Sequence, residues 1–226
     1  MKQDKWEKTD KYTYSLMKVE ESIKWKKLAS NYKPDWIAPS NSYPGLWAKV
    51  PQTYFDFINQ LIPSLLSNFS AELKNVKRVA CNYALATTSH EELHDYQQIP
   101  HFDSQLNNQI AIVHYLCSQE FGGTGFYYHN SSEIEVVTAK NRASYVDTLA
   151  NEMTHLNNKS SQYIEDNHPL FTRTHYEQAQ FGKLICYPGN LLHSACIPSV
   201  DLTVSKLTEG RLTITTFIEL DFELRL

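Results

Sequence analysis

The sequence predicts a mainly β protein with flanking helices, and three features support this fold class. A run with apolar residues at helical spacing extends from Tyr54 to Phe69. After Val76 the chain changes to short β-rich runs separated by turn residues, and one helical stretch, residues 142–157, interrupts them. Short strands after an N-terminal helix favour a sandwich or barrel over a parallel α/β sheet. The strand-like runs are VKRVACNYAL, NNQIAIVHYL, GTGFYYH, FGKLICYP and RLTITTFIEL.

Residues 1–75 are expected to wrap around this β domain and to pack helices on it. The helix predicted from Tyr54 to Phe69 carries one broad apolar stripe, which indicates packing against a sheet. Pro63 removes one backbone hydrogen bond, so we expect a kink or a break there. The stripe consists of Phe55, Ile58, Leu61, Ile62, Leu65 and Leu66.

Residues 76–226 are expected to form the main domain, with a helical insert at about residues 130–178. Within the insert, residues 142–157 place apolar side chains on one helix face. Because both ends of the insert join strands near the predicted site, it could flank the site's entrance and select the substrate. Packing on the outside of the domain, or a dimer contact, is the alternative.

Composition narrows the classes of partner. The net charge is −4, without the basic excess that non-specific nucleic-acid binding needs. We expect no membrane partner, because no apolar run is long enough to cross a bilayer. The N-terminal residues are polar, and the four cysteines form no CxxC pair. We therefore expect a cytoplasmic protein with free thiols. The oligomeric state stays open, with a homodimer as one alternative.

The strongest chemical signal is the pair His101 and Asp103. In an extended segment, residues two apart point to the same side, so both side chains can bind one metal. A third ligand, His193, follows a strand and the turn at residues 188–190, so a hairpin can return it to the same site. Two histidines and one carboxylate suit iron(II) and leave three adjacent positions open. A surface turn pair and a capping or core histidine are the structural alternatives.

A candidate anion clamp opens the last strand. Arg211 and Thr213 share one face of it because strand side chains alternate. A guanidinium can form two parallel charge-assisted bonds to a carboxylate, and the neighbouring hydroxyl can add another. A structural ion pair of Arg211 is the alternative.

The order of these motifs resembles the 2-oxoglutarate- and iron(II)-dependent oxygenases, most closely the prolyl-hydroxylase-like branch. The likeness covers roughly residues 80–220: HxD, then GGTGFY, then GKLICYPGNxxH, then GRxT. It implies a double-stranded β-helix, that is, a jelly-roll or cupin-like barrel. It also implies metal ligands at His101, Asp103 and His193, and a clamp of Arg211 and Thr213 for 2-oxoglutarate. Tyr115, upstream of GGTGFY, is the candidate for a second cosubstrate contact, with core packing as its alternative.

The resemblance implies an activity but no particular substrate. It implies that 2-oxoglutarate and O2 react at the iron, with oxidative decarboxylation to succinate coupled to hydroxylation. A free amino acid, a peptide side chain and a small metabolite all remain as substrates. A cupin-type metalloenzyme without 2-oxoglutarate and a non-catalytic sensor or interaction module are the rival functions. One departure is the long spacing from His193 to Arg211, which predicts a bulging loop near Ser199 to Glu209.

Overall fold

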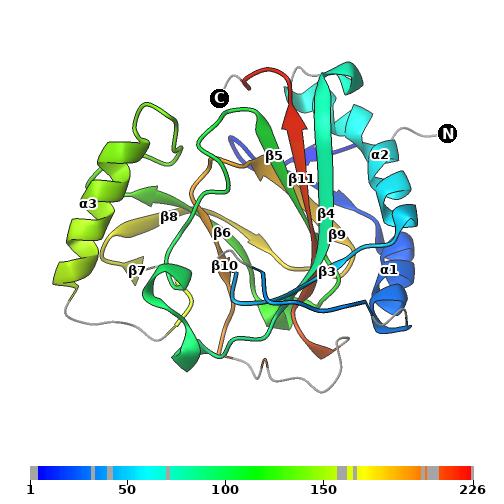
Figure 1. Cartoon of the computed structure of the whole chain (residues 1–226), viewed down its shortest axis with the longest axis horizontal. Helices are drawn as coiled ribbons and strands as arrows, with labels where there is room; N and C mark the ends of the chain where they lie inside the picture. Colours follow the sequence, from blue (N-terminus) through cyan, green and yellow to red (C-terminus); the bar gives the residue numbers. More distant parts are fainter. Residues whose placement is uncertain are drawn as a thin grey trace.

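Within the residues that the computed structural model describes, the chain forms two antiparallel sheets and three α-helices (Figure 1). The structure describes residues 5–31, 34–39, 43–69, 72–156, 162–164, 167–199, 202 and 209–224. Most of the loop predicted near Ser199 to Glu209 lies outside these residues. The helices are α1 (Val19–Asn31), α2 (Gln52–Leu66) and α3 (Arg142–His155). Short 3-10 helices are η1 (Ser67–Phe69), η2 (Leu73–Asn75), η3 (His90–Glu92), η4 (Asp95–Gln97) and η5 (Gln119–Phe121).

The larger sheet has seven strands in the order β1-β2-β9-β5-β11-β4-β3. These are β1 (Glu7–Lys8), β2 (Tyr14–Met17), β9 (Lys183–Pro188), β5 (Gln109–Tyr115), β11 (Leu212–Leu220), β4 (Val76–Ala86) and β3 (Gly45–Lys49). The smaller sheet has four strands in the order β10-β6-β8-β7. These are β10 (His193–Cys196), β6 (Gly123–His129), β8 (Phe171–Gln178) and β7 (Asn167–His168). The prediction of a mainly β chain with flanking helices is confirmed.

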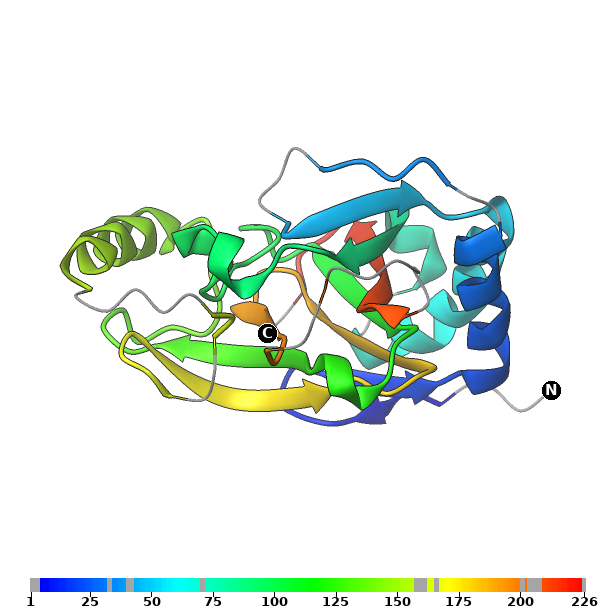
Figure 2. The ribbon, with the colours of Figure 1, turned by 90° about the horizontal axis from the view of Figure 1, so that it is seen from below.

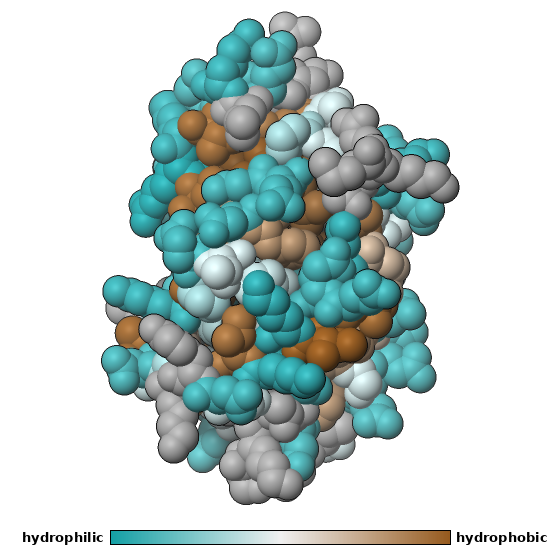
Figure 3. All heavy atoms as spheres, turned by 90° about the vertical axis from the view of Figure 1, so that its right-hand side faces the viewer, coloured by the Kyte–Doolittle hydropathy of each residue, from teal (hydrophilic) through white to brown (hydrophobic). Residues whose placement is uncertain are grey.

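Alternation along β5 divides the core between the two faces of the larger sheet. Ile110 and Ile112 join the cluster that contains the apolar stripe of α2, whereas Ala111 and Val113 join a cluster with Phe126 of the smaller sheet. The helices α1 and α2 thus cover one face, and α3 lies at the opposite end of the molecule (Figures 1 and 2). Hydrophilic side chains cover much of the outer surface on the α1 and α2 side, with hydrophobic ones between them (Figure 3).

The helix α2 corrects part of the expectation for Pro63. The expected break is wrong, because the helix continues through Pro63 to Leu66, and the kink stays a prediction. The proline costs one hydrogen bond near the end of the helix, and burial of Leu61, Ile62 and Leu65 outweighs that loss.

Strands outside the predicted runs extend both sheets. The segment before Val76 contributes β2, which pairs with β9, and β3, which pairs with β4. The helix predicted at residues 142–157 is confirmed as α3, but residues 171–178 of the predicted insert form β8, the direct partner of β6. The smaller sheet therefore depends on a strand that the sequence pattern did not show.

Gly122, just before β6, allows the backbone to approach Cys196 at the end of β10 closely. It has a φ of 80°, and a Cβ at this position would lie 1.8 Å from the carbonyl oxygen of Cys196. Glycine reaches this backbone region at little cost and has no Cβ to collide. The GGT sequence thus has a steric reason, which is the close approach of the chain after β10.

Two further expectations concern thiols and membranes. All four cysteines are free, as predicted, and three of them are buried. Within the described ranges, no helix combines the length and the apolar character that crossing a membrane requires.

Candidate metal centre and adjoining cavity

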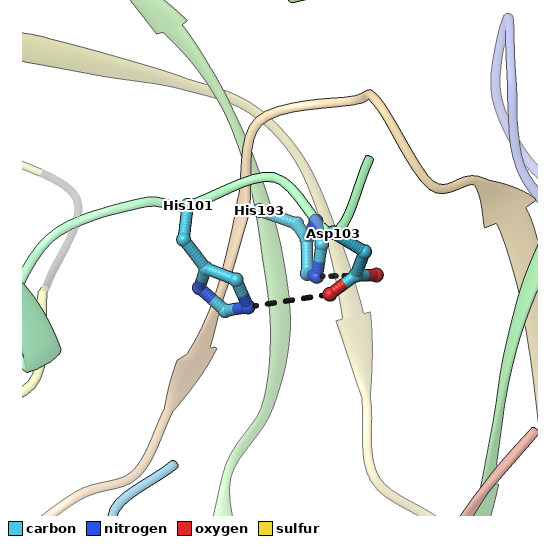
Figure 4. A group of neighbouring side chains, drawn as sticks. All are labelled: His101, Asp103 and His193. Atoms are coloured by element: carbon cyan, nitrogen blue, oxygen red, sulfur yellow. Dashed lines mark ion pairs between the residues drawn. The ribbon is translucent and has the colours of Figure 1, made fainter. Parts of the chain in front are cut away.

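The structure brings His101, Asp103 and His193 together, and their ligand atoms all lie within 4.8 Å of one another (Figure 4). Nε2 of His101 is 3.8 Å from one carboxylate oxygen of Asp103, and Nε2 of His193 is 3.5 Å from the other. The carboxylate of Asp103 thus approaches both rings from one side, and the ring centroids of His101 and His193 are themselves only 4.4 Å apart. No other group of three or more metal-ligating side chains occurs in the part of the chain that the structure describes.

Backbone hydrogen bonds position all three residues. His101 and His193 form an isolated antiparallel bridge, with N–H···O distances of 2.8 and 2.9 Å in the two directions. The N–H of Asp103 donates to the carbonyl oxygen of Gly189 at 2.7 Å. The turn before β10, at residues 188–190, thus fixes the segment that carries His101 and Asp103.

The ring of His193 is oriented by its own second nitrogen. Nδ1 lies 2.7 Å from the carbonyl oxygen of Leu191, so Nδ1 carries the proton and donates it there. Nε2 is then left with its lone pair directed at Asp103. The Tyr187 ring packs at 4.7 Å between centroids and holds the imidazole in place. This arrangement is typical of histidine that ligates a metal.

Burial sets the protonation of two of the three groups. It lowers the pKa of His193 to about 4, so the ring is neutral near pH 7 and can act as a ligand. Burial also raises the pKa of the Asp103 carboxyl to about 6, while nearby His101 acts in the opposite direction. A carboxylate shielded from water in this way gains from a nearby cation. The side chain of His101 is 56% exposed, so the group opens to solvent on that side.

A cavity of about 400 Å³ adjoins these residues. Side chains from strands of both sheets line it, including Val113 of β5, Thr124 of β6 and Thr215 of β11. All three ligand residues and Arg211 also line it. Its volume lies in the range of about 300–1,000 Å³ that is usual for small-ligand sites.

Arg211 places a positive charge in this cavity, and no described residue forms an ion pair with it. The residue is 4% exposed, and Nη2 donates to the carbonyl oxygen of Gly123 at 3.1 Å. Nε has no hydrogen-bond partner, and no carboxylate of the described residues forms an ion pair with it. The structural ion pair that was the alternative for Arg211 is therefore not seen in the described ranges. A buried cation of this kind favours binding of an anion.

The other two predicted cosubstrate residues differ in position. Thr213 lines the cavity beside Arg211, and its hydroxyl donates to the carbonyl oxygen of Ala84 at 3.3 Å. Tyr115 does not line the cavity. Its hydroxyl lies 2.6 Å from that of Thr124, which does line it. A contact between Tyr115 and a ligand would therefore run through Thr124.

Several cavity residues were not predicted. Tyr43 and Trp47 come from the N-terminal segment, Tyr96 from η4, and Tyr163 from the segment between α3 and β7. None of them belongs to a motif. The only signal in the sequence was the aromatic content of these segments, which packing explains equally well.

Fold and side chains together describe a mainly β protein with a candidate two-histidine, one-carboxylate metal centre. The chain belongs to a family of unknown function (DUF6445), which it matches over residues 16–218. No protein with a curated description matches it.

Solved structures with a similar chain path include enzymes that use α-ketoglutarate (2-oxoglutarate). The non-haem α-ketoglutarate-dependent carbocyclase SnoK from nogalamycin biosynthesis is 11% identical, with a TM-score of 0.52 over 92% of this chain and 79% of that one. A Pseudomonas putida prolyl-4-hydroxylase is 11% identical, with a TM-score of 0.43 over 94% and 95%. HygX from Streptomyces hygroscopicus, with nickel and 2-oxoglutarate bound, is 12% identical, with a TM-score of 0.47 over 93% and 83%. The likeness to SnoK shows a shared fold, and the two lower scores add nothing to it.

Proposed function

We propose that the protein is an iron(II)- and 2-oxoglutarate-dependent oxygenase built on a double-stranded β-helix. One observation carries the proposal: His101, Asp103 and His193 line the same cavity as the guanidinium of Arg211, which has no ion-pair partner among the described residues. A ligand that chelates a metal and also carries a distant carboxylate would use both features. SnoK, which shares the fold, is described as α-ketoglutarate-dependent, and this supports the choice of ligand.

The side chains present fit the metal that the proposal requires. Two neutral imidazoles and one carboxylate form the donor set that suits iron(II) and leaves positions free for other ligands. The hydrogen bond of His193 Nδ1 to the carbonyl oxygen of Leu191 leaves Nε2 free to ligate a metal. Burial raises the pKa of Asp103, and a bound cation would counteract that shift by favouring the carboxylate.

Each protein group then has a definite task. His101, Asp103 and His193 would hold the iron, and Arg211 with Thr213 would bind the distal carboxylate of 2-oxoglutarate. Thr124, supported by Tyr115, would add a hydroxyl to the cosubstrate site. When bound, the iron and 2-oxoglutarate supply the oxidising power for hydroxylation of a C–H bond, with succinate as coproduct. The protein contributes orientation and a cavity that limits the access of water.

The setting proposed for this activity is the cytoplasm. Four free thiols agree with a reducing compartment.

An anaerobic titration tests the proposal. Iron(II) is added first, then 2-oxoglutarate, and each binding step is followed by calorimetry. Oxygen is then admitted and succinate is measured. We expect one iron and one 2-oxoglutarate per chain and formation of succinate that depends on both. Iron binding without 2-oxoglutarate binding would favour a cupin-type metalloenzyme. A chain that binds neither would favour a sensor or interaction module.

A further inference from the structure

We infer that the substrate bound in this cavity is a neutral, planar aromatic molecule rather than a free amino acid or a charged peptide side chain. This inference rests on the proposed function and adds the class of substrate. It follows from which side chains line the cavity, where charge is present among them, and how exposed each end is.

Charge is the first argument. Among the described residues that line the cavity, the only ones that are charged or ligate a metal are the three ligand residues and Arg211. The proposed function assigns all four to the iron and the cosubstrate. No lysine and no glutamate lines the cavity within the described ranges. A substrate ammonium or carboxylate would therefore lose its hydration without gaining an opposite charge, which is strongly unfavourable.

Aromatic surface is the second argument. The remaining lining is rich in aromatic side chains, which offer flat faces and edges for a planar ring. They include Trp47, Tyr96, Phe102, Tyr163, Tyr187 and Phe217. These residues come from separate elements: β3, η4, the segment after it, the segment after α3, β9 and β11. Several aromatic side chains in one cavity favour a planar ring as ligand, because such a ring can stack on them or meet them edge-on.

The third argument is the difference in exposure within the cavity. Arg211 is only 4% exposed, whereas Tyr96 is 59% exposed and the side chain of His101 is 56% exposed. The buried end thus suits the cosubstrate, whose carboxylate the proposed function assigns to Arg211. The exposed end, beside the metal ligands, is where a second molecule can enter. Tyr96 and Phe102 are the aromatic residues closest in sequence to His101 at this entrance.

A matched set of probes tests the charge argument. The probes are 2-naphthol, 2-naphthoate and 2-(aminomethyl)naphthalene, which share one ring system and are neutral, negative and positive at pH 7. Each is titrated by calorimetry into the anaerobic protein loaded with iron(II) and saturating 2-oxoglutarate. We expect 2-naphthol to bind at least about tenfold more tightly than either charged probe, since burying an unpaired charge is costly.

The outcomes separate this inference from the proposed function. If 2-oxoglutarate binds but a charged probe binds as tightly as 2-naphthol, the substrate class is wrong and the proposed function stands. Tighter binding of the ammonium probe would mean that the aromatic residues form a cation site instead. Absence of binding by all three probes also overturns the inference. If 2-oxoglutarate itself does not bind, the proposed function fails and this inference fails with it.

A pair of variants tests whether 2-naphthol binds at the exposed end of the cavity, beside Tyr96. Tyr96→Ala should weaken 2-naphthol binding by roughly two- to tenfold, the worth of one aromatic contact. Because Tyr96 is exposed, its replacement leaves the core intact, and a 2-oxoglutarate titration on the same variant checks the cosubstrate site. Tyr128→Ala is the control, since Tyr128 lies on β6 outside the cavity lining. Equal 2-naphthol affinity in Tyr96→Ala and the unaltered protein would overturn the assignment of the entrance.

Discussion

The ring of Tyr145 in α3 packs edge-on against the ring of Phe102, with centroids 6.2 Å apart and planes inclined by 66°. Phe102 is the residue between the two candidate ligands His101 and Asp103. Tyr145 also contacts the ring of His129 at 5.2 Å, so it joins the ligand segment to the end of β6. No residue of α3 lines the cavity. The helix therefore supports the ligand segment from behind, while Tyr163 of the same insert reaches the cavity.

Tyr145→Ala should lower both stability and iron affinity. Loss of a buried aromatic ring costs about 3–5 kcal/mol of unfolding free energy, and the ligand segment loses its support. Tyr145→Phe is the matched control, because the Tyr145 hydroxyl has no hydrogen-bond partner among the described residues and its removal should cost little. Urea unfolding and iron(II) titration of both variants measure the effect. Equal iron affinity in the two variants would show that α3 has no role in positioning the ligands.

Removal of a candidate ligand should abolish tight iron binding. We expect one iron(II) per chain in the unaltered protein, and loss of it in His101→Ala and in Asp103→Ala, because each change removes a donor from a set of three. His155→Ala is the control, since this exposed histidine lies at the end of α3 away from the site. Metal analysis after gel filtration gives the occupancy. Full occupancy in both ligand variants would contradict the site.

Arg211→Ala should weaken 2-oxoglutarate while leaving iron binding nearly unchanged. Loss of a buried charge-assisted pair costs about 2–5 kcal/mol of binding free energy, since the carboxylate is left unpaired. Arg211→Lys should recover only part of it, because an ammonium cannot form the two parallel bonds. Calorimetric titration compares both variants with the exposed control Arg142→Ala. If Arg211→Ala binds 2-oxoglutarate with unchanged affinity, the clamp lies elsewhere.

His114 is a buried polar residue between the larger sheet and the helices that cover it. Nε2 lies 2.7 Å from the hydroxyl of Ser22 in α1, and Nδ1 lies 3.2 Å from that of Tyr54 in α2. Burial lowers the pKa of His114 to about 3. The folded protein therefore holds this ring neutral, and protonation favours the unfolded chain.

The pH dependence of stability follows from this shift. A folded-state pKa below the ordinary value of 6.5 means that the contribution is complete above pH 6.5 and is lost as the pH falls toward 3. The loss is at most about 1.4 kcal/mol per pH unit. His114→Gln keeps hydrogen-bonding capacity but cannot titrate, so its loss of stability between pH 6.5 and 5 should be smaller by about 1.6 kcal/mol. Urea unfolding at both pH values measures the difference, and equal losses would contradict the role of His114.

Local patterns predicted the central strands and the grouping of the candidate ligands. The run GTGFYYH forms β6 with the predicted bounds. The turn before β10 places His193 opposite His101, as the hairpin prediction indicated. The two-residue periodicity also placed His101 and Asp103 on one side. The strand β6 and the pair His101 and Asp103 depend on near neighbours in the chain, which is why the residues alone predicted them. His193 is distant in sequence, and its place beside them was predicted from the turn together with the order of the motifs.

Features that depend on distant contacts were not predictable in the same way. The polar run FTRTHYEQ gives no clear strand pattern, yet pairing with β6 makes it β8. Tyr115 lies on the inner face as alternation requires, but Thr124 stands between it and the cavity, and only the packing of two sheets determines that. Trp47 and Tyr163 reach the cavity through tertiary packing of segments without motifs.

The mutual bridge between His101 and His193 has a consequence for the folding of the chain. The chain between these two residues contains the helix α3 and strands of both sheets, among them β5, β6, β8 and β9. The bridge closes a long loop, so it can form only when the order gained elsewhere offsets the entropy of closure. A nascent or partly unfolded chain offers at most His101 and Asp103 to a metal. Full coordination at the proposed site and completion of the fold would thus be a single event, and iron bound there would in turn hold the ends of this loop together.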